Sequence, residues 1–419
     1  MKELILSALK QAGIDEYRIT DTFTESAEAF FVKKRLDLKR RKENRRIAIT
    51  VFSNFSNEKG EMKGFADIFV FPGIDTEELV KKLRDAKYAA GFVANPTYDL
   101  GKAEKGSVLK NLPDIEEGLM TMSKALFSAD TGESAFVNSA EVFATKKRTN
   151  IIMSNGTDVT YNSFRISGEF VAQCKEPQDV ETYMDFAYDG LDTESLKKLV
   201  AETLETTLAR AKATEAPKAG KYRVMISGRY VKDIFNFYEA LSSDAFIYAK
   251  YSKFKVGDAV QGSDVTGDKF NMSLKALEPF SSEGIRMKDL KLLKDGVLLA
   301  THGPKRFAHY LGVEATGNYS AFTVEPGTVS LEEMKKEPYL NIVNFSDFQL
   351  NEMNGSFGGE IRLAFLFDGE KVTPVTGGSI NGNFIELQKN ARISKETQKQ
   401  LDYEGPYAIC FESINVAGK

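Results

Sequence analysis

The chain carries the stretch SAEAFFVKKR at residues 26–35 and a near copy of it, SAEVFATKKR, at residues 139–148. Seven of the ten positions are identical, at an offset of 113 residues. A second pair, GIDTE at residues 73–77 and GLDTE at residues 190–194, lies at an offset of 117. Two matches that keep their order and nearly their spacing indicate one unit that was copied once and then adjusted in a loop.

Each copy is expected to fold as a helix, a group of strands and a second helix. In the first copy an apolar stripe from Leu4 to Ala12 predicts a helix that ends at Gly13. Strand patterns follow around residues 17–24, 29–36, 46–52 and 64–71. Asp75 with Glu78 three residues later is a capping signature for the closing helix. The second copy repeats the plan, with helical stripes at residues 115–126 and 196–208.

The pattern changes after residues 213–220, where the helical periodicity stops. A buried strand is expected at residues 222–227 and a helix at residues 230–241. The remainder is rich in strand patterns, with hairpin turns at Asp295-Gly296 and Asp368-Gly369. We therefore expect an α+β fold. It divides into a duplicated N-terminal domain at residues 1–215, with modules at about 1–105 and 106–215, and a β-rich C-terminal domain at residues 222–419.

The composition is that of a globular protein. The 419 residues include 56 basic and 60 acidic side chains, and a net charge of −4 argues against a general affinity for nucleic acid. No apolar run approaches the ~18 residues of a membrane span. The first ten residues have an amphipathic helical pattern rather than the apolar core of a signal peptide. Two cysteines cannot form a disulfide framework, so we expect a cytoplasmic protein without membrane contact.

Residues suited to catalysis are scarce. The only histidines are His302 and His309, and on one helix they would lie about 10.5 Å apart along the axis, too far to share a metal ion directly. Cys174 follows a strand pattern and Cys410 lies inside one, so inert buried thiols are favoured over a nucleophile. The glycine spacings of dinucleotide- and phosphate-binding loops and the G-x-S-x-G elbow are absent.

One charge cluster remains. Residues 33–46 hold nine basic and two acidic side chains, a net charge of +7 in fourteen residues. The cluster fits an anion-binding surface, or a solvated hairpin whose charges keep an exposed strand edge from pairing. Because no aromatic residue is interleaved to stack on bases, the second interpretation is favoured.

Five motifs of the C-terminal half occur in the same order in a known family. They are SEGIR at 282–286, LKDGVL at 293–298, YLGVEATGN at 310–318, GSFGGEIR at 355–362 and PVTGGSINGN at 374–383. In these motifs the chain resembles the TldD/PmbA family, and the order of its N-terminal modules is similar. Members of that family are described as modulators of DNA gyrase. The resemblance implies a cytoplasmic metalloprotease built from two related subunits.

The resemblance also implies which subunit this chain is similar to. TldD-type subunits carry His-Glu-x-x-x-His on the helix after the first strand of the second domain, and a cysteine further on completes the zinc site. The corresponding segment here, residues 229–241, holds no histidine, and Cys410 does not match the family's cysteine. The chain therefore resembles the PmbA (TldE) type. This resemblance implies that the chain has no catalytic and no metal-binding residue, and that a TldD-like partner holds the zinc.

Two main hypotheses follow. In the first, the chain is the non-catalytic subunit of a TldD/TldE-like metalloprotease that acts on peptides or unfolded polypeptides, paired with a histidine-bearing subunit. In the second, it is a stand-alone homo-oligomeric binding protein that kept the fold without catalysis. An active peptidase that uses His302 or His309 is a third. For peptide binding through backbone hydrogen bonds, the candidate residues are Gly377, Gly378 and Ser379.

Overall fold

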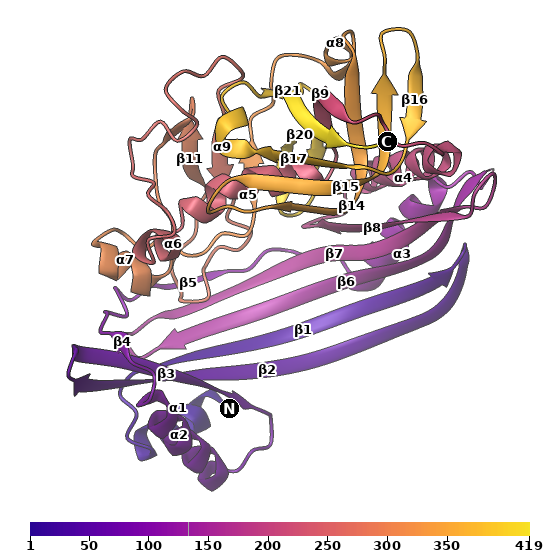
Figure 1. Ribbon diagram of the computed structural model, residues 1–419. Coiled ribbons are helices and arrows are strands. Elements are labelled where there is room, and N and C mark those ends of the chain that lie inside the picture. Colours follow the sequence, from indigo (N-terminus) through magenta and orange to yellow (C-terminus); the bar gives the residue numbers. More distant parts are fainter. Residues whose placement is uncertain (133) are drawn as a thin grey trace.

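The first half of the chain builds one long sheet, shown in indigo to magenta in Figure 1. The computed structural model describes residues 1–132 and 134–419. The first module comprises α1 (Lys2–Gln11), β1 (Tyr17–Val32), β2 (Arg35–Asn57), β3 (Gly60–Val70) and α2 (Thr76–Ala90). The second comprises α3 (Ile115–Ser128), β6 (Ala135–Met153), β7 (Asp158–Cys174), β8 (Val180–Tyr188) and α4 (Thr193–Lys212). The short strands β4 (Asn95–Pro96) and β5 (Lys105–Val108) lie between the modules. The sheet has the order β4-β3-β2-β1-β6-β7-β5, with β8 also paired to β7.

The two modules join through equivalent strands. β1 pairs antiparallel with β6, and Ala29 lies opposite Val142, which occupies the equivalent position of the second copy, 113 residues later. This register places a local two-fold axis through that pair. An axis perpendicular to the sheet leaves both helix pairs on one face. The cores agree, because Ile19 packs with α1 and α2 while Ala27 and Ala29, on the same face of the uninterrupted β1, pack with α3 and α4.

The expected break between residues 24 and 29 was wrong. β1 runs without interruption to Val32, and the chain turns at Lys33, whose φ is 54°. Ser26 and Glu28, between the two expected strands, alternate with the inward-facing Ala27 and Ala29 and therefore face away from the helices. Among them Glu28 is 6% exposed and forms ion pairs with Arg40 and with Lys42, at 2.9 Å in the second case. A buried carboxylate is tolerated here because it is paired twice.

The second half of the chain contains two further sheets and several short helices (Figure 1). Its helices are α5 (Tyr230–Leu241), α6 (Asp244–Tyr248), α7 (Lys305–Leu311), α8 (Leu331–Met334) and α9 (Phe384–Leu387). A six-stranded sheet has the order β12 (Val297–Leu298), β11 (Leu290–Lys294), β10 (Met272–Leu274), β13 (Phe322–Val324), β20 (Tyr403–Pro406) and β19 (Thr397–Lys399). A seven-stranded sheet contains β9 (Gly220–Ser227), β14 (Tyr339–Leu350), β15 (Ser356–Phe367), β16 (Val372–Val375), β17 (Ser379–Asn383), β18 (Arg392–Ile393) and β21 (Ala408–Ala417).

In the seven-stranded sheet β14 pairs with both β9 and β15, so β14, β9, β21, β17 and β15 form a closed ring. Helix α5 packs its apolar face, including Ile234, Phe235 and Tyr238, into the core that this sheet shares with the six-stranded sheet. The predicted strand at 222–227 and helix at 230–241 are confirmed as β9 and α5. The α+β class is confirmed as well.

Both predicted hairpins are present. Asp295 and Gly296 have φ values of 50° and 77°, as a two-residue hairpin between β11 and β12 requires. Gly369, with φ of 102°, lies in the turn between β15 and β16. No helix in residues 1–132 and 134–419 is both long and apolar enough to cross a membrane.

The packing of the sheet yields a stability prediction at Gly168, in the middle of β7. A Cβ atom there would lie 2.2 Å from the carbonyl oxygen of Glu141 and 2.6 Å from the ring of Phe186. Gly168→Ala should therefore lower the free energy of unfolding by about 1–3 kcal/mol, measured by urea denaturation. Gly190→Ala is the matched control, because a Cβ at Gly190 meets nothing within 4 Å. Equal unfolding midpoints for the two variants would contradict the close packing of β7 against β8.

Candidate functional site

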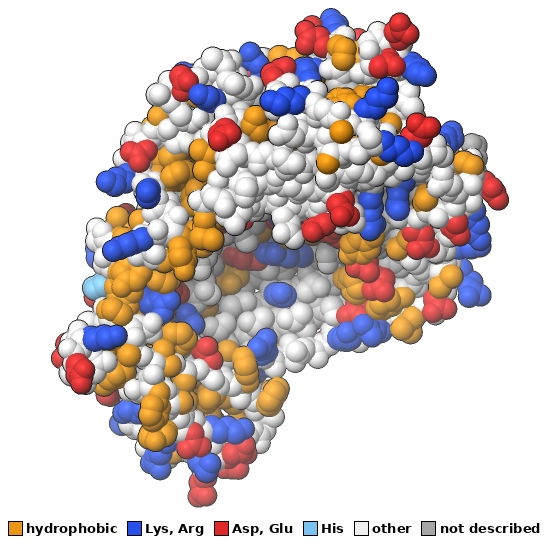
Figure 2. Space-filling model, viewed as in Figure 1, with side chains coloured by type: hydrophobic (Ala, Val, Ile, Leu, Met, Phe, Trp, Pro, Cys, Tyr) orange, Lys and Arg blue, Asp and Glu red, His pale blue; other side chains and the backbone are white. Residues whose placement is uncertain are grey.

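A cleft separates the C-terminal domain from the long sheet. Its volume is about 690 Å³, and its walls come from β8, α4, the beginning of α5, β14 and residues 397–407. Figure 2 shows the molecule hollowed between its upper and lower parts, with both basic and acidic side chains inside the hollow. The cleft is thus bounded by both halves of the chain.

One wall of the cleft is an open strand edge. β8 pairs with β7 along one side only, and residues 181–185, with Ala187 and Tyr188, line the cleft. On the outer side of β8, Gln400 and Leu401 contact the backbone of Ala187: the amide of Ala187 donates to the side chain of Gln400 (3.1 Å), and the amide of Leu401 donates to the carbonyl of Ala187 (2.7 Å). The edge before Ala187 has no strand partner in the described ranges.

The opposite wall contains a second open edge. β14 pairs with β9 only at residues 340–342, because β9 ends at Ser227 and the chain continues into α5. Beyond that point Tyr230 replaces the missing strand at one residue, since its hydroxyl accepts a hydrogen bond from the amide of Phe345 (3.0 Å). Residues 343–348 of β14 line the cleft. Two unpaired strand edges therefore border the same cavity.

Charged side chains line the space between these edges. The basic ones are Lys198, Arg210, Arg229, Lys232, Arg362 and Lys399. Four of them are in ion pairs: Arg229 with Asp185 (2.8 Å), Lys399 with Asp192 (3.7 Å), Lys198 with Glu202 (3.8 Å), and Lys232 with Asp402. Burial also raises the pKa values of Glu202 and Asp233 above their ordinary range. The cleft is polar and its charges are largely balanced.

The C-terminal half matches a known family. The family model described as "PmbA/TldA metallopeptidase C-terminal domain" covers residues 219–418. The C-terminal domain is a PmbA/TldD domain. This finding confirms the family resemblance that the five motifs carried.

Relatives and solved structures agree with this assignment. An uncharacterised protein of Methanocaldococcus jannaschii is 24% identical over 359 residues, covering 78% of this chain and 80% of that protein. A protein of Saccharolobus solfataricus named zinc metalloprotease TldD homolog is 21% identical over 64% of this chain and 59% of that protein. The crystal structure of TldE from Thermococcus kodakarensis has a TM-score of 0.77 at 18% identity and covers 100% of both chains. A candidate modulator of a DNA gyrase from Thermotoga maritima has a TM-score of 0.76 at 18% identity over 99% of both chains. The whole chain therefore has the fold of these proteins.

The donor set of this PmbA/TldD domain does not fit a zinc ion at α5. The residues at its start that line the cleft are Arg229, Tyr230, Lys232 and Asp233. The two cations among them already form ion pairs, Arg229 with Asp185 and Lys232 with Asp402. Zinc sites in proteins use thiolates, imidazoles and carboxylates, not ammonium or guanidinium groups. Within the described part of the chain, no three His, Cys, Asp or Glu side chains are placed to hold a metal ion.

The two histidines lie in different settings. His302 is 3% exposed, and its Nε2 lies 2.9 Å from the carbonyl oxygen of Glu239. His309 is exposed on α7. Both cysteines are buried, and burial raises the pKa of Cys410 to about 12, which makes its thiol unreactive near neutral pH.

Two of the candidate residues, Gly377 and Gly378, lie in the turn between β16 and β17, and the third, Ser379, begins β17. The two glycines have φ values of 88° and 77°, and a Cβ on Gly378 would lie 2.4 Å from the carbonyl oxygen of Ala417. Ser379 already has strand partners on both sides, in β15 and β21. Because this backbone is already paired, the tight turn accounts for the two glycines. Peptide binding at these residues stays a prediction. Sequence patterns gave no sign of the two open edges of the cleft, because an edge depends on which strands are neighbours.

The basic cluster at residues 33–46 forms the tip and one side of the β1–β2 hairpin. Its outer edge is unpaired, because β3 pairs with β2 only from Ile47 onward. Most basic side chains of the cluster form ion pairs with carboxylates outside it, including Arg41 with Glu25 (3.1 Å) and Arg45 with Asp21 (2.6 Å). The arrangement matches the charged-edge interpretation.

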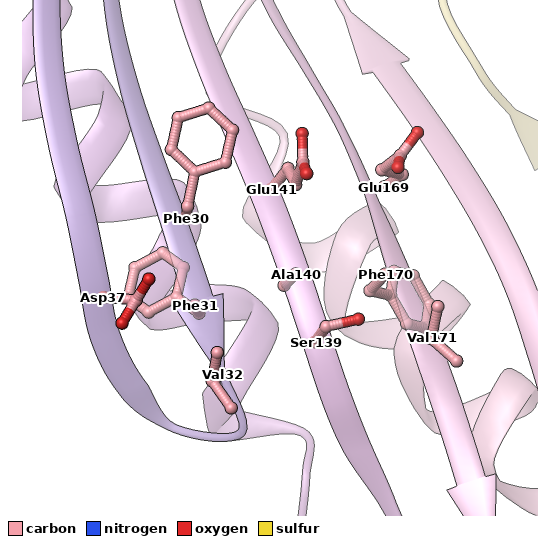
Figure 3. Close-up of a pocket in the computed structure, with 10 residues that line it drawn as sticks. All are labelled: Phe30, Phe31, Val32, Asp37, Ser139, Ala140, Glu141, Glu169, Phe170 and Val171. Carbon is pink, nitrogen blue, oxygen red and sulfur yellow. The ribbon is translucent and has the colours of Figure 1, made fainter.

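A smaller cavity of about 230 Å³ lies near that hairpin (Figure 3). Phe30 and Val32 of β1 line it, together with the carboxylates of Asp37, Glu141 and Glu169. Glu169 accepts a hydrogen bond from the hydroxyl of Tyr183 (2.8 Å). Among the residues that the structure describes, these carboxylates are not arranged to bind a metal ion.

The end of α5 yields a pH-dependent prediction. Burial raises the pKa of Glu239 from its ordinary value of 4.5 to about 7, with Glu352 adding to the effect and Lys232 opposing it. The neutral carboxyl therefore favours folding below pH 4.5, and this contribution is lost as the pH rises through 7. Relative to wild type, Glu239→Gln should gain about 2 kcal/mol in unfolding free energy between pH 5 and pH 8. Urea denaturation at both values checks this, and a pH-independent difference between the two proteins would contradict it.

Proposed function

We propose that this chain is the metal-free subunit of a TldD/TldE-like cytoplasmic metalloprotease and that it holds peptides or unfolded polypeptides in extended form. In this role it binds the substrate, and a histidine-bearing partner subunit supplies zinc and performs the cleavage. The observation that carries the proposal is the cleft with an unpaired strand edge on each side, at β8 and at β14.

Strand addition is the recognition that such edges offer. An extended peptide that lies along β8 completes the backbone hydrogen bonds that the outer side of this strand lacks. Because backbone groups make these bonds, the binding tolerates many side chains. That tolerance suits a subunit that receives unfolded polypeptides of varied sequence.

The absence of a fitting donor set at α5 supports the assignment to the partner role. Arg229 and Lys232 place positive charge where a second cation would be repelled. The similarity to a protein named zinc metalloprotease TldD homolog and to TldE supports the same division between two subunits. A stand-alone homo-oligomer that binds peptides is the alternative, and isolation from cells distinguishes the two.

The first test is of strand addition and leaves the protein unchanged. A fluorescein-labelled octapeptide of alternating Ala and Thr should bind the full chain, measured by fluorescence anisotropy. N-methylation of every second amide removes the hydrogen-bond donors on one side of the extended peptide, so two methylated peptides can be made, one for each alternating set of amides. The peptide that loses the donors facing the protein should bind about tenfold or more weakly than the unmethylated peptide. The peptide methylated on the other set is the matched control. Equal affinities for all three peptides would contradict strand addition.

The second test is of the partner. Purification of the tagged chain from its own cells should recover a second polypeptide that carries His-Glu-x-x-x-His, with about one zinc ion per pair. Recovery of the chain alone and free of zinc would instead support the homo-oligomeric alternative. Zinc bound to this chain without a partner would contradict the metal-free role.

A further inference from the structure

Two arginines in the cleft differ from the other cations there. Lys198, Arg229, Lys232 and Lys399 each have a carboxylate partner. Arg210 and Arg362 line the same cavity, and neither forms an ion pair with any residue in the ranges that the structure describes. In a cleft whose charges are otherwise balanced, these two guanidinium groups are left over.

The two arginines come from α4 and β15, two elements that contact each other. Arg210 is in the last turn of α4, and its Nη1 donates a hydrogen bond to the carbonyl oxygen of Glu181 in β8 (2.6 Å). Arg362 is on β15, and its neighbour Ile361 pairs with Phe345 on the side of β14 away from the open edge. Burial lowers the pKa of Arg210, and the positive charge of Arg362 lowers it further.

Arg210 is partly buried and Arg362 is exposed, so water weakens their repulsion, and an anion between them would relieve the remainder. A further polar group of the cleft wall is also without a partner. The hydroxyl of Thr182, next to Glu181, belongs to a residue only 3% exposed and makes no hydrogen bond. The site therefore offers hydrogen-bond donors to an acceptor that this chain does not supply.

The position of the pair relates it to the open edges. Arg210 is fixed to the beginning of the β8 edge through Glu181, and Arg362 lines the same cavity as residues 343–348 of β14. A peptide strand between the edges would bring one of its ends to this pair. The group that an end or side chain of a peptide presents to two guanidiniums is a carboxylate, which arginine binds through two parallel hydrogen bonds.

We propose that Arg210 and Arg362 bind a peptide carboxylate, so that the cleft prefers peptides whose C-terminal end lies between α4 and β15. This rests on the proposed peptide-binding function and names the class of substrate. The same chemistry is available from an acidic side chain within a longer peptide. The experiment therefore compares the two sources of carboxylate.

The experiment measures the affinity of the full chain for three octapeptides of alternating Ala and Thr, each labelled with fluorescein at the N-terminus. The first ends in a free carboxylate, the second in an amide, and the third ends in an amide but carries one Glu at its last position. The free acid should bind about tenfold or more tightly than the plain amide, and the ratio should fall as salt rises. The Glu peptide reports whether a side-chain carboxylate serves equally well.

Variants assign the preference to the two arginines. Arg210→Gln and Arg362→Gln should each bring the ratio of acid to amide affinities close to one. Lysine at either position should restore part of the ratio, because it keeps the charge and loses the bidentate geometry. Arg35→Gln is the matched control, since Arg35 is an exposed arginine of the β1–β2 hairpin that does not line the cleft. Thermal unfolding confirms that each variant is folded.

The outcomes separate this inference from the function on which it rests. Equal and measurable affinities of the acid and the amide would overturn the carboxylate site and leave peptide binding intact. A preference that survives both glutamine variants would place the carboxylate elsewhere in the cleft and would also overturn it. Failure of all three peptides to bind at millimolar concentration would contradict both the site and the proposed function.

Discussion

The antiparallel pairing of β1 with β6 is the constraint on which the rest of the structure depends. Fifteen residues of β1 pair with β6 without a register shift, around the equivalent residues Ala29 and Val142. The two-fold relation sends all four helices of the modules to one face of the sheet. The other face is left for the C-terminal domain, whose Phe280 packs with Phe52 and Ile151 there. The C-terminal domain also contacts α4 through β15 and β16, and the cleft is bounded by β8, α4 and β14.

The sequence predicted the duplicated plan, α5, β9 and both hairpins, since these depend on local patterns and on a repeat that is visible by eye. It failed at residues 25–28, where no strand was predicted although β1 runs through them and the carboxylate of Glu28 is buried by Arg40 and Lys42 from the next strand. Arg362 stood in a motif that supported the family resemblance, yet its role depends on α4, which is more than 150 residues earlier in the chain. No local signal indicates that two strands will lack a neighbour at the same cavity.

The charges near the beginning of α5 show how the two faces of one helix take different roles. Arg229 forms an ion pair with Asp185 of β8 and so connects the two halves of the molecule across the cleft, whereas Lys232 pairs with Asp402 inside the C-terminal domain. The aromatic and aliphatic residues on the other face of the helix still fill the shared core. Substitutions on the cleft face of α5 therefore change the chemistry, whereas substitutions on its buried face would change the stability.

The two modules put equivalent edges of the duplicated sheet to different purposes. In the first copy the outer edge of β3 pairs with β4 at Met62 and Lys63 and does not line the cleft. In the second copy the corresponding outer edge of β8 faces the cleft. Doubling the unit thus provided a second edge, and only this copy is placed to offer its backbone to a guest strand in the cleft.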